Sequence, residues 1–331
     1  MTDAAALDHP DLSPADARTG VAHLLGPYLN DLRRLSLAHR LRDVAVFVGL
    51  WGVGLALAAA SGVAENPWPL RLAALGASAL ALNAFVLLLH EGMHGVLFQN
   101  RAANRCASVL FGAAVGMSFT GYRRLHTLHH DHLGTDDDPD DYHAYTRSPL
   151  AFWLLQGLRL AVGAAVYVVA IPVLAARRGT AEDRRHMAQE YAVLVALWAA
   201  ALWLVPSAVL LWGWLLPLPV VAALVQIRGL TQHGLTERHD PLLASRTVRP
   251  HPVVAFFLLN ENLHLEHHLF PEVPSYHLPA LHEAIWDRLP RACEGTSYLG
   301  FLGRFARQSV ALDETPVGIV APASAAPLAG A

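Results

Sequence analysis

Lysine is absent from this chain of 331 residues, and cysteine is nearly so: all 24 basic residues are arginine, and Cys106 and Cys293 are the two thiols. Two cysteines cannot build a disulfide scaffold or a cysteine-rich metal site. The formal net charge of −3 gives no indication of a nucleic-acid partner. The start of the chain is acidic and polar, with Asp3 and Asp8, so we expect no cleavable signal peptide.

Charge of either sign is scarce as well. Charged residues make up 15% of the chain, whereas soluble domains average about 25%. Hydrophobic residues make up 54% even before glycine is counted. This composition excludes a disordered chain and predicts an all-α, multi-pass membrane protein.

The longest uncharged runs divide into two pairs of candidate spans. Residues 44–64 are uncharged and long enough to cross a bilayer, and after a short turn residues 72–89 are uncharged up to His90. Residues 191–227 form a run too long for one crossing, so we expect it to fold back near Pro206. The sequence therefore predicts two transmembrane helical hairpins, with spans at about 44–64, 71–90, 190–206 and 208–227.

Arginine placement distinguishes the two ends of the first hairpin. Arg33, Arg34, Arg40 and Arg42 precede it, whereas the turn ENPWP between its helices holds no basic residue. By the positive-inside rule, the N-terminus and His90 face the cytoplasm. We expect a bacterial plasma membrane protein with this end on the cytoplasmic side.

Other segments are less clear. Residues 106–122 are short for a span, and residues 150–176 contain Arg159, so we expect both to form interfacial or re-entrant helices. A true span at 150–176 is the alternative. Residues 1–40 are predicted to be a polar segment with an interfacial helix, and residues 313–331 have the composition of a disordered tail.

Histidine is the residue whose placement is unusual. Three windows of five residues, 90–94, 126–130 and 264–268, read HEGMH, HTLHH and HLEHH, and hold eight of the 19 histidines. Residues three and four apart share one face of a helix, whereas on a strand positions i and i+3 point to opposite faces. The spacing therefore predicts a helix at each window, with its imidazoles aimed in one direction.

These imidazoles are suited to metal binding. Neutral imidazole is a common ligand of zinc, copper and iron. A zinc site uses at most four protein ligands, so eight or more imidazoles fit two metals with open positions better. Adjacent histidines on a helix diverge by about 100°, so His129 and His130, like His267 and His268, are each suited to serve two neighbouring metals.

Polar residues beside the windows could orient the imidazoles through their second ring nitrogen. Glu91, Asp131 and Glu266 lie inside or directly after the windows, and Asn260 and Asn262 precede the third. The further acidic candidates, for which a solvated loop is the alternative, are Asp136, Asp137, Asp138, Asp140 and Asp141.

Longer sequences around the windows carry a resemblance. HEGMHGVLFQNRAANR, RRLHTLHHDHLGTDDDPD and SRTVRPHPVVAFFLLNENLHLEHHLFPEVPSYHLPALH follow one another in that order. Together they resemble the histidine boxes of the membrane fatty acid desaturase family, which also contains hydroxylases and carotenoid ketolases. The resemblance covers roughly residues 40 to 290. It implies a desaturase-like membrane domain over residues 41–312, with a cytosolic helical cap that carries the boxes.

The resemblance also implies a di-iron centre that uses O₂. A further ligand precedes the third box in the family, and it matches His233 in RGLTQHGL, although Gln232 stands where many relatives have an acidic residue. His132, His143 and His239 fall outside the patterns. The ligands carried over are His90, His94, His126, His129, His130, His233, His264, His267 and His268.

The implied reaction is desaturation of a fatty acyl chain or lipid, with hydroxylation or ketolation of a lipid or carotenoid as the alternative. No haem, flavin or ferredoxin segment is visible, so electrons are expected from a separate donor such as a ferredoxin and its reductase. The alternative outside the enzymes is a histidine-rich membrane metal transporter. It would place histidines along its spans rather than in three boxes.

Overall fold

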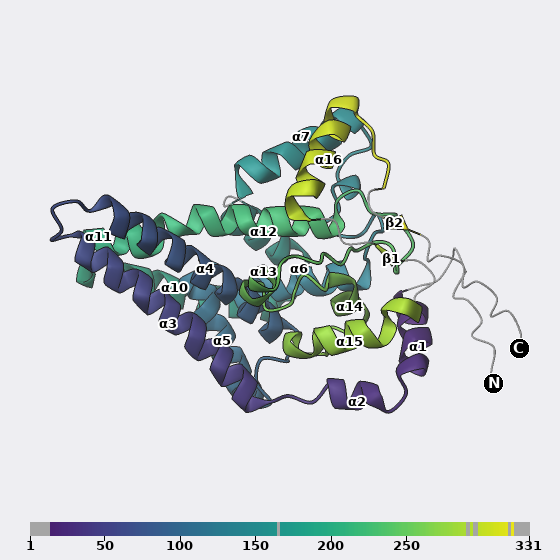
Figure 1. The fold of residues 1–331 in the computed structure, drawn as a ribbon, viewed down its shortest axis with the longest axis horizontal. Helices are drawn as coiled ribbons and strands as arrows, with labels where there is room; N and C mark the ends of the chain where they lie inside the picture. Colours follow the sequence, from purple (N-terminus) through teal and green to yellow (C-terminus); the bar gives the residue numbers. More distant parts are fainter. Residues whose placement is uncertain (1–13, 164–165, 289–291, 294–296, 317–318, 321–331) are drawn as a thin grey trace, which may run out of the picture.

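The computed structural model describes residues 14–163, 166–288, 292–293, 297–316 and 319–320, and their regular secondary structure is almost entirely helical (Figure 1). Four helices are long and apolar enough to cross a membrane: α3 (Leu37–Ser61), α4 (Trp68–Met93), α10 (Ala181–Leu204) and a run from Ser207 to His233. That last run consists of α11 (Ser207–Leu210), the π-helical η3 (Leu211–Leu215) and α12 (Pro217–His233). Each of the four predicted spans coincides with one of these helices or helical runs, with ends that differ by a few residues.

The two hairpins lie side by side with their turns at the same end. The Trp51 indole of α3 donates a hydrogen bond to the carbonyl of Gly213 in η3, at 3.0 Å. At the turns, the rings of Trp68 and Trp212 meet edge to face with centroids 5.8 Å apart. The ends of α4 and α12 that carry His90 and His233 therefore both lie away from the turns.

Burial differs strongly among the four spans. In α4, 67% of the most apolar window is buried inside the molecule, against 17% in α10. Leu82, Leu87 and Leu88 of α4 are fully enclosed, whereas Trp203 of α10 is 88% exposed. An apolar face this exposed is the face that a membrane protein presents to lipid. The central position of α4 fixes the histidines at its end in the middle of the molecule.

Residues 106–122, expected to be interfacial or re-entrant, are divided between two helices, and their position relative to the membrane stays a prediction. Helix α5 (Arg101–Ala114) ends where the chain turns through Gly116, whose φ of +80° is in the left-handed region, and α6 (Phe119–Asp131) begins after it. Gly112 makes the turn compact, because a Cβ there would lie 2.5 Å from the Met117 carbonyl oxygen. The break lets α6 turn back, so that its histidines lie next to those of α4.

The described part of residues 150–176 is divided among α7 (Pro149–Ala161), the π-helical η2 (Val166–Ala170) and α9 (Ile171–Arg178). None of these is among the four candidate spans. The alternative of a true span there is therefore not supported. An interfacial position stays a prediction.

The histidine end is covered by short elements from both ends of the chain. Helices α1 (Pro14–Leu25) and α2 (Tyr28–Leu32) pack against α14 (His264–Leu269) and α15 (Leu278–Ile285) in one apolar cluster. Glu272 accepts hydrogen bonds at 2.5 Å from both Arg18 and Arg33. The predicted helix within residues 1–40 is present, although residues 1–13 lie outside the described range.

The C-terminal part adds α16 (Tyr298–Ala311), which packs Phe301 and Phe305 against Trp153 of α7 and Leu230 of α12. A pair of two-residue antiparallel strands, β1 (Ala292–Cys293) and β2 (Ile319–Val320), is the described exception to the all-α prediction. Most of the predicted disordered tail, residues 313–331, lies outside the described residues. The remaining short elements are η1 (Tyr142–Ala144), α13 (Pro252–Phe257), η4 (Ser275–His277) and η5 (Trp286–Arg288).

Candidate metal centre

The first histidine window forms the end of α4. His90 lies in its last turn and is buried, and His94 is the residue that caps the helix before Gly95 turns the chain at a φ of +76°. The backbone of this turn is held from α5, because the Asn104 side-chain amide donates to the Gly92 carbonyl at 2.8 Å. The i, i+4 spacing therefore places both rings on one face, as predicted.

The second window lies on α6, whose start is fixed by a buried acid of α10. The Glu190 carboxylate accepts hydrogen bonds from the Ser118 hydroxyl at 2.7 Å and from the Thr120 amide at 2.8 Å. An acid bound to the free amides at a helix start stabilises that end of the helix. This contact sets the rotation of α6 and thereby the direction of its three imidazoles.

The third window is the short helix α14, and His233 ends α12. Before α14 the chain passes through Leu259 and Asn260, whose φ angles of +48° and +60° turn it back toward α4. His264 and His267 are buried, and His233 and His268 are half-buried. All three predicted helical windows are helical in the structure, the first ending at its last histidine.

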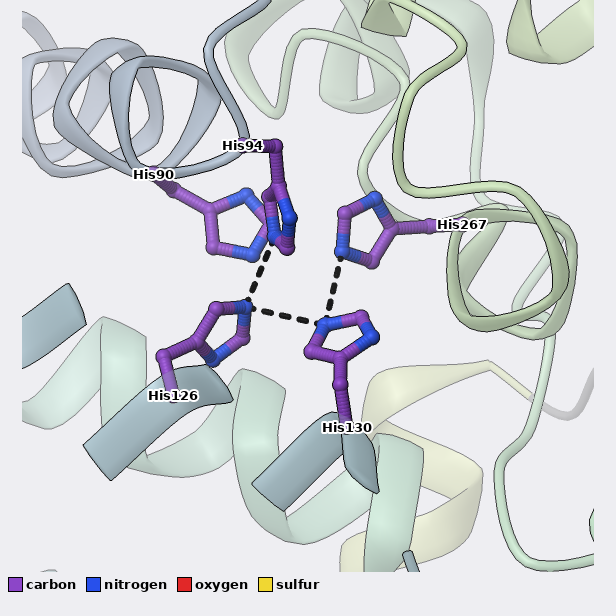
Figure 2. Close-up of side chains that lie close together, drawn as sticks. All are labelled: His90, His94, His126, His130 and His267. Carbon is purple, nitrogen blue, oxygen red and sulfur yellow. Dashed lines mark hydrogen bonds between the residues drawn. The ribbon is translucent and has the colours of Figure 1, made fainter. Parts of the chain in front are cut away.

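The predicted ligands gather into two adjoining groups. Within each group the candidate ligand atoms all lie within 4.8 Å of one another. The first histidine group consists of His90, His94, His126, His130 and His267, from three separate segments that point toward one another (Figure 2). The second histidine group consists of His129, His233 and His268. His264 falls outside this compact set, but its Nε2 lies 2.8 Å from that of His233 and 3.2 Å from that of His268.

Each adjacent histidine pair is divided between the two groups. His130 and His267 belong to the first group, whereas their neighbours His129 and His268 belong to the second. The rings of His130 and His268 stack with centroids 4.2 Å apart, so the groups adjoin directly. This division is what the angular separation of neighbours on a helix predicts.

The contacts between the rings fit a metal. His126 Nε2 lies 3.0 Å from the Nε2 atoms of both His94 and His130, and His130 Nε2 lies 3.3 Å from that of His267. A neutral imidazole nitrogen either carries one hydrogen or offers one lone pair, so it cannot make a full hydrogen bond with each of two others. A cation among these nitrogens can accept every lone pair.

The protonation states agree with this interpretation. Outside the spanning helices, burial lowers the pKa of six of these histidines well below the ordinary value, which keeps the rings neutral, the form that binds metal. These residues are His94, His126, His130, His264, His267 and His268. His129 differs: burial alone would lower its pKa, but the Asp138 carboxylate beside it raises the pKa overall.

Carboxylates lie beside the second nitrogen of several rings. Asp138 lies 2.8 Å from Nδ1 of His129, so of the acidic run this residue contacts a predicted ligand directly. Glu261, which the sequence analysis did not single out, lies 3.4 Å from Nδ1 of His90 and 4.0 Å from Nδ1 of His264. Its position three residues before His264 is the sequence feature that could have identified it as a partner of the histidines. Burial raises the pKa of Glu261 to about 7.

Other candidates serve the surrounding structure. Glu91 forms a buried ion pair with Arg40, and Glu266 contacts His282 and accepts a hydrogen bond from Thr247 at 2.5 Å. The amides of Asn260 and Asn262 donate to the backbone carbonyls of Ser275 and Val248, and their role in orienting a water or a ligand stays a prediction. Asp131 is exposed.

The histidines predicted to lie outside the site do so. His132 caps the end of α6, and His143 stacks on Phe152 with centroids 4.4 Å apart. His239 takes a left-handed φ of +66° and donates its backbone amide to Gly134. None of the three is a member of either histidine group in the described chain.

A cavity of about 430 Å³ adjoins both groups. His90, His126, His129, His233 and His264 lie at its inner wall. Apolar side chains of α7, α9 and α12 form much of the remainder, namely Leu155, Leu158, Val162, Ile171, Leu174 and Val225. Its volume lies in the range of small-molecule sites, about 300–1,000 Å³.

Comparison with known proteins agrees with the motifs. Comparison with curated protein sequences gives no match. The family described as fatty acid desaturase matches residues 66–299, which is more than half of the chain and includes all nine histidines of the site. The chain therefore belongs to the fatty acid desaturase family.

Proposed function

We propose that this protein is a membrane di-iron oxidoreductase that uses O₂ and electrons from a separate donor to desaturate an acyl chain. The observation that carries the proposal is the division of each adjacent histidine pair between two adjoining groups. Two metals side by side need such a division, whereas a transport pathway needs ligands spaced along the spans. Membership of the desaturase family supports the same choice.

The chain's own residues would hold the two irons. The first histidine group would hold one, and the second group together with His264 would hold the other. When bound, iron supplies the capacity to activate O₂ and oxidise an unactivated C–H bond. In the balanced reaction the substrate loses two hydrogens, the donor supplies two electrons, two protons are taken up, and O₂ leaves as two waters.

The protein's part is to position the substrate and exclude water. Leu158, Ile171 and Val225 offer an apolar wall along which a hydrocarbon chain can lie beside His90 and His126. Asp138 fixes the orientation of the His129 ring, and the Glu261 carboxylate lies beside the second nitrogen of His90. A ring held by a carboxylate keeps its other nitrogen directed at the metal.

The test combines metal analysis with product analysis. The purified protein is expected to hold about two irons per chain, and a host that expresses it is expected to accumulate a lipid lighter by two hydrogens. A lipid heavier by one oxygen would replace desaturation with hydroxylation. Exchangeable zinc and no new lipid would overturn the enzyme proposal in favour of transport.

A further inference from the structure

Two arginines line the cavity beside the histidines, and they differ in their hydrogen-bond partners. Arg159 of α7 has partners: it donates to the Gln226 side chain, lies 3.6 Å from Asp140 and faces the Tyr142 ring at 5.6 Å. Arg228 of α12 is more than nine-tenths buried, and its Nη1 has no hydrogen-bond partner among the described residues. Both arginines line the cavity wall.

Helix geometry directs Arg228 into the cavity. Val225, Arg228, Gly229, Gln232 and His233 all line the cavity, and their spacing of three and four residues places them on one face of α12. The guanidinium is close to the histidine end, because Arg228 lies five residues before His233 on α12 and both residues line the cavity. The arginine therefore belongs to the inner part of the cavity.

A buried guanidinium without a full set of acceptors is costly in a cavity that takes a methylene chain alone. Glu261 is buried at the same end of the molecule, but its Oε1 also lacks a hydrogen-bond partner among the described residues. The Tyr298 hydroxyl is another buried group without one. An acceptor oxygen is the chemistry that this guanidinium needs.

The opposite part of the cavity is suited to a hydrocarbon tail. Leu158 both lines the cavity and is 54% exposed, so the cavity opens along the outer face of α7. Leu150 and Leu154 continue this exposed stripe at intervals of four residues. A tail that leaves through this opening meets an apolar surface.

Resting on the proposed function, we infer that the substrate binds with a carboxyl-derived oxygen on Arg228 and its tail toward α7, so that oxidation occurs near the head-group end of the chain. Arg228 is then a specificity-determining residue. It selects acyl compounds over hydrocarbons of the same length, and it fixes which carbons lie beside His90 and His126.

The test measures binding with three probes of equal chain length: hexadecanoic acid, methyl hexadecanoate and hexadecane. The iron-loaded protein in detergent is titrated with each probe, and the shift of the thermal unfolding midpoint gives the apparent affinity. The wild type is expected to bind the acid and the ester at least about tenfold more tightly than the hydrocarbon. Arg228→Met is expected to bind all three alike, with the hexadecane affinity unchanged.

Arg185→Met is the matched control, because Arg185 is an exposed arginine of α10 and its loss changes the net charge equally. It is expected to keep the wild-type preference. If Arg228→Met does not fold, Arg228→Gln replaces it, and the preference for the acid over the hydrocarbon is expected to decrease. Equal binding of the three probes by the wild type, or an unchanged preference in the folded Arg228 variant, would overturn the inference.

Product analysis separates this inference from the proposed function. A double bond in the half of the chain nearer the carbonyl supports it, and one in the distal half contradicts it. If the loaded enzyme with a reductant oxidises no lipid at all, the proposed function fails while the binding preference still decides the role of Arg228. If lipid is oxidised but the probes bind alike, the inference fails alone.

Discussion

Single residues decide which metal each imidazole can serve. His129 and His130 are neighbours in sequence. His129 belongs to the second histidine group and contacts Asp138, whereas His130 belongs to the first group and lies between His126 and His267. Because no ring of one group replaces a ring of the other, neither group has a spare ligand from its own windows. The chemistry is therefore expected to be sensitive to every one of these residues.

We predict that alanine at any one of six paired-window histidines lowers product formation by at least about a hundredfold, the upper end of the effect of disturbing a ligand's surroundings. The six are His126, His129, His130, His264, His267 and His268. Insertion depends on the two hairpins, so each variant is expected to remain membrane-inserted and extractable. A cell-based lipid assay normalised to protein level measures the loss. Near-normal activity in two or more variants would rule out the di-iron assignment.

Glu261 provides a prediction that activity alone does not decide. It is buried beside His90 and His264, so Glu261→Gln removes the charge that lies next to both rings while keeping the side-chain shape. We expect the affinity for iron to fall about 10–100-fold, as for other residues that orient a ligand. Competition against a chelator measures this, with the exposed Glu283→Gln of α15 as control. Wild-type iron affinity in Glu261→Gln would mean that this carboxylate only supports the fold.

At the scale of elements, the site depends on how closely α4 and α5 pack. Gly92 lies between His90 and His94, and a Cβ there would overlap the Ser108 hydroxyl of α5. That hydroxyl is fixed by its own hydrogen bond to the Asn104 carbonyl at 2.6 Å, so it has little freedom to move. The close approach thus positions the first histidine window as well as the helices.

We therefore predict that Gly92→Ala destabilises the protein by about 1–3 kcal/mol, the usual cost of an overpacked core, and reduces its iron content. Gly52→Ala in α3 is the matched control, because nothing lies within 4 Å of a Cβ at that position. It is expected to keep its iron and to gain slightly in stability through higher helix propensity. Thermal unfolding and metal analysis of both variants measure the difference. Equal behaviour of the two would show that α5 yields without moving His90 or His94.

The elements also show where sequence reasoning succeeds. The spans and the helical windows followed from hydrophobic run length and histidine spacing, both local properties. The turn through Gly116 and the roles of Asn260, Arg159 and Glu261 depend on which distant segment packs against them. Arg159, which made residues 150–176 ambiguous, contacts Gln226 of α12, a partner 67 positions away. Such pairings have no local signature.

At the scale of the whole molecule, the even number of spans requires the turns to lie on one side of the membrane and the histidine groups on the other. The contacts of Trp51 with Gly213 and of Trp68 with Trp212 bring both turns together. Arg33 and Arg40, which indicated the cytoplasmic side, are bound to Glu272 and Glu91 at the histidine end. Their charge is thus partly neutralised in the folded protein, but it is present when the chain is inserted.

This architecture predicts the outcome of cysteine labelling in intact cells. With Cys106 and Cys293 replaced by serine, single cysteines are introduced as Asp137→Cys before η1, Glu283→Cys on α15 and Val63→Cys in the first turn; all three sites are exposed. A membrane-impermeant maleimide is expected to label position 63 from outside, and to label positions 137 and 283 only after the membrane is permeabilised. The reasoning is that both hairpins open toward the histidines, so residues on either side of the second hairpin share one compartment. Labelling of 137 and 283 from opposite sides would require an odd number of spans between them, and residues 150–176 would then have to cross the bilayer. If positions 137 and 283 were labelled from outside and position 63 only after permeabilisation, the hairpins would stand. The histidine groups would then lie outside the cell, beyond the reach of a cytoplasmic electron donor.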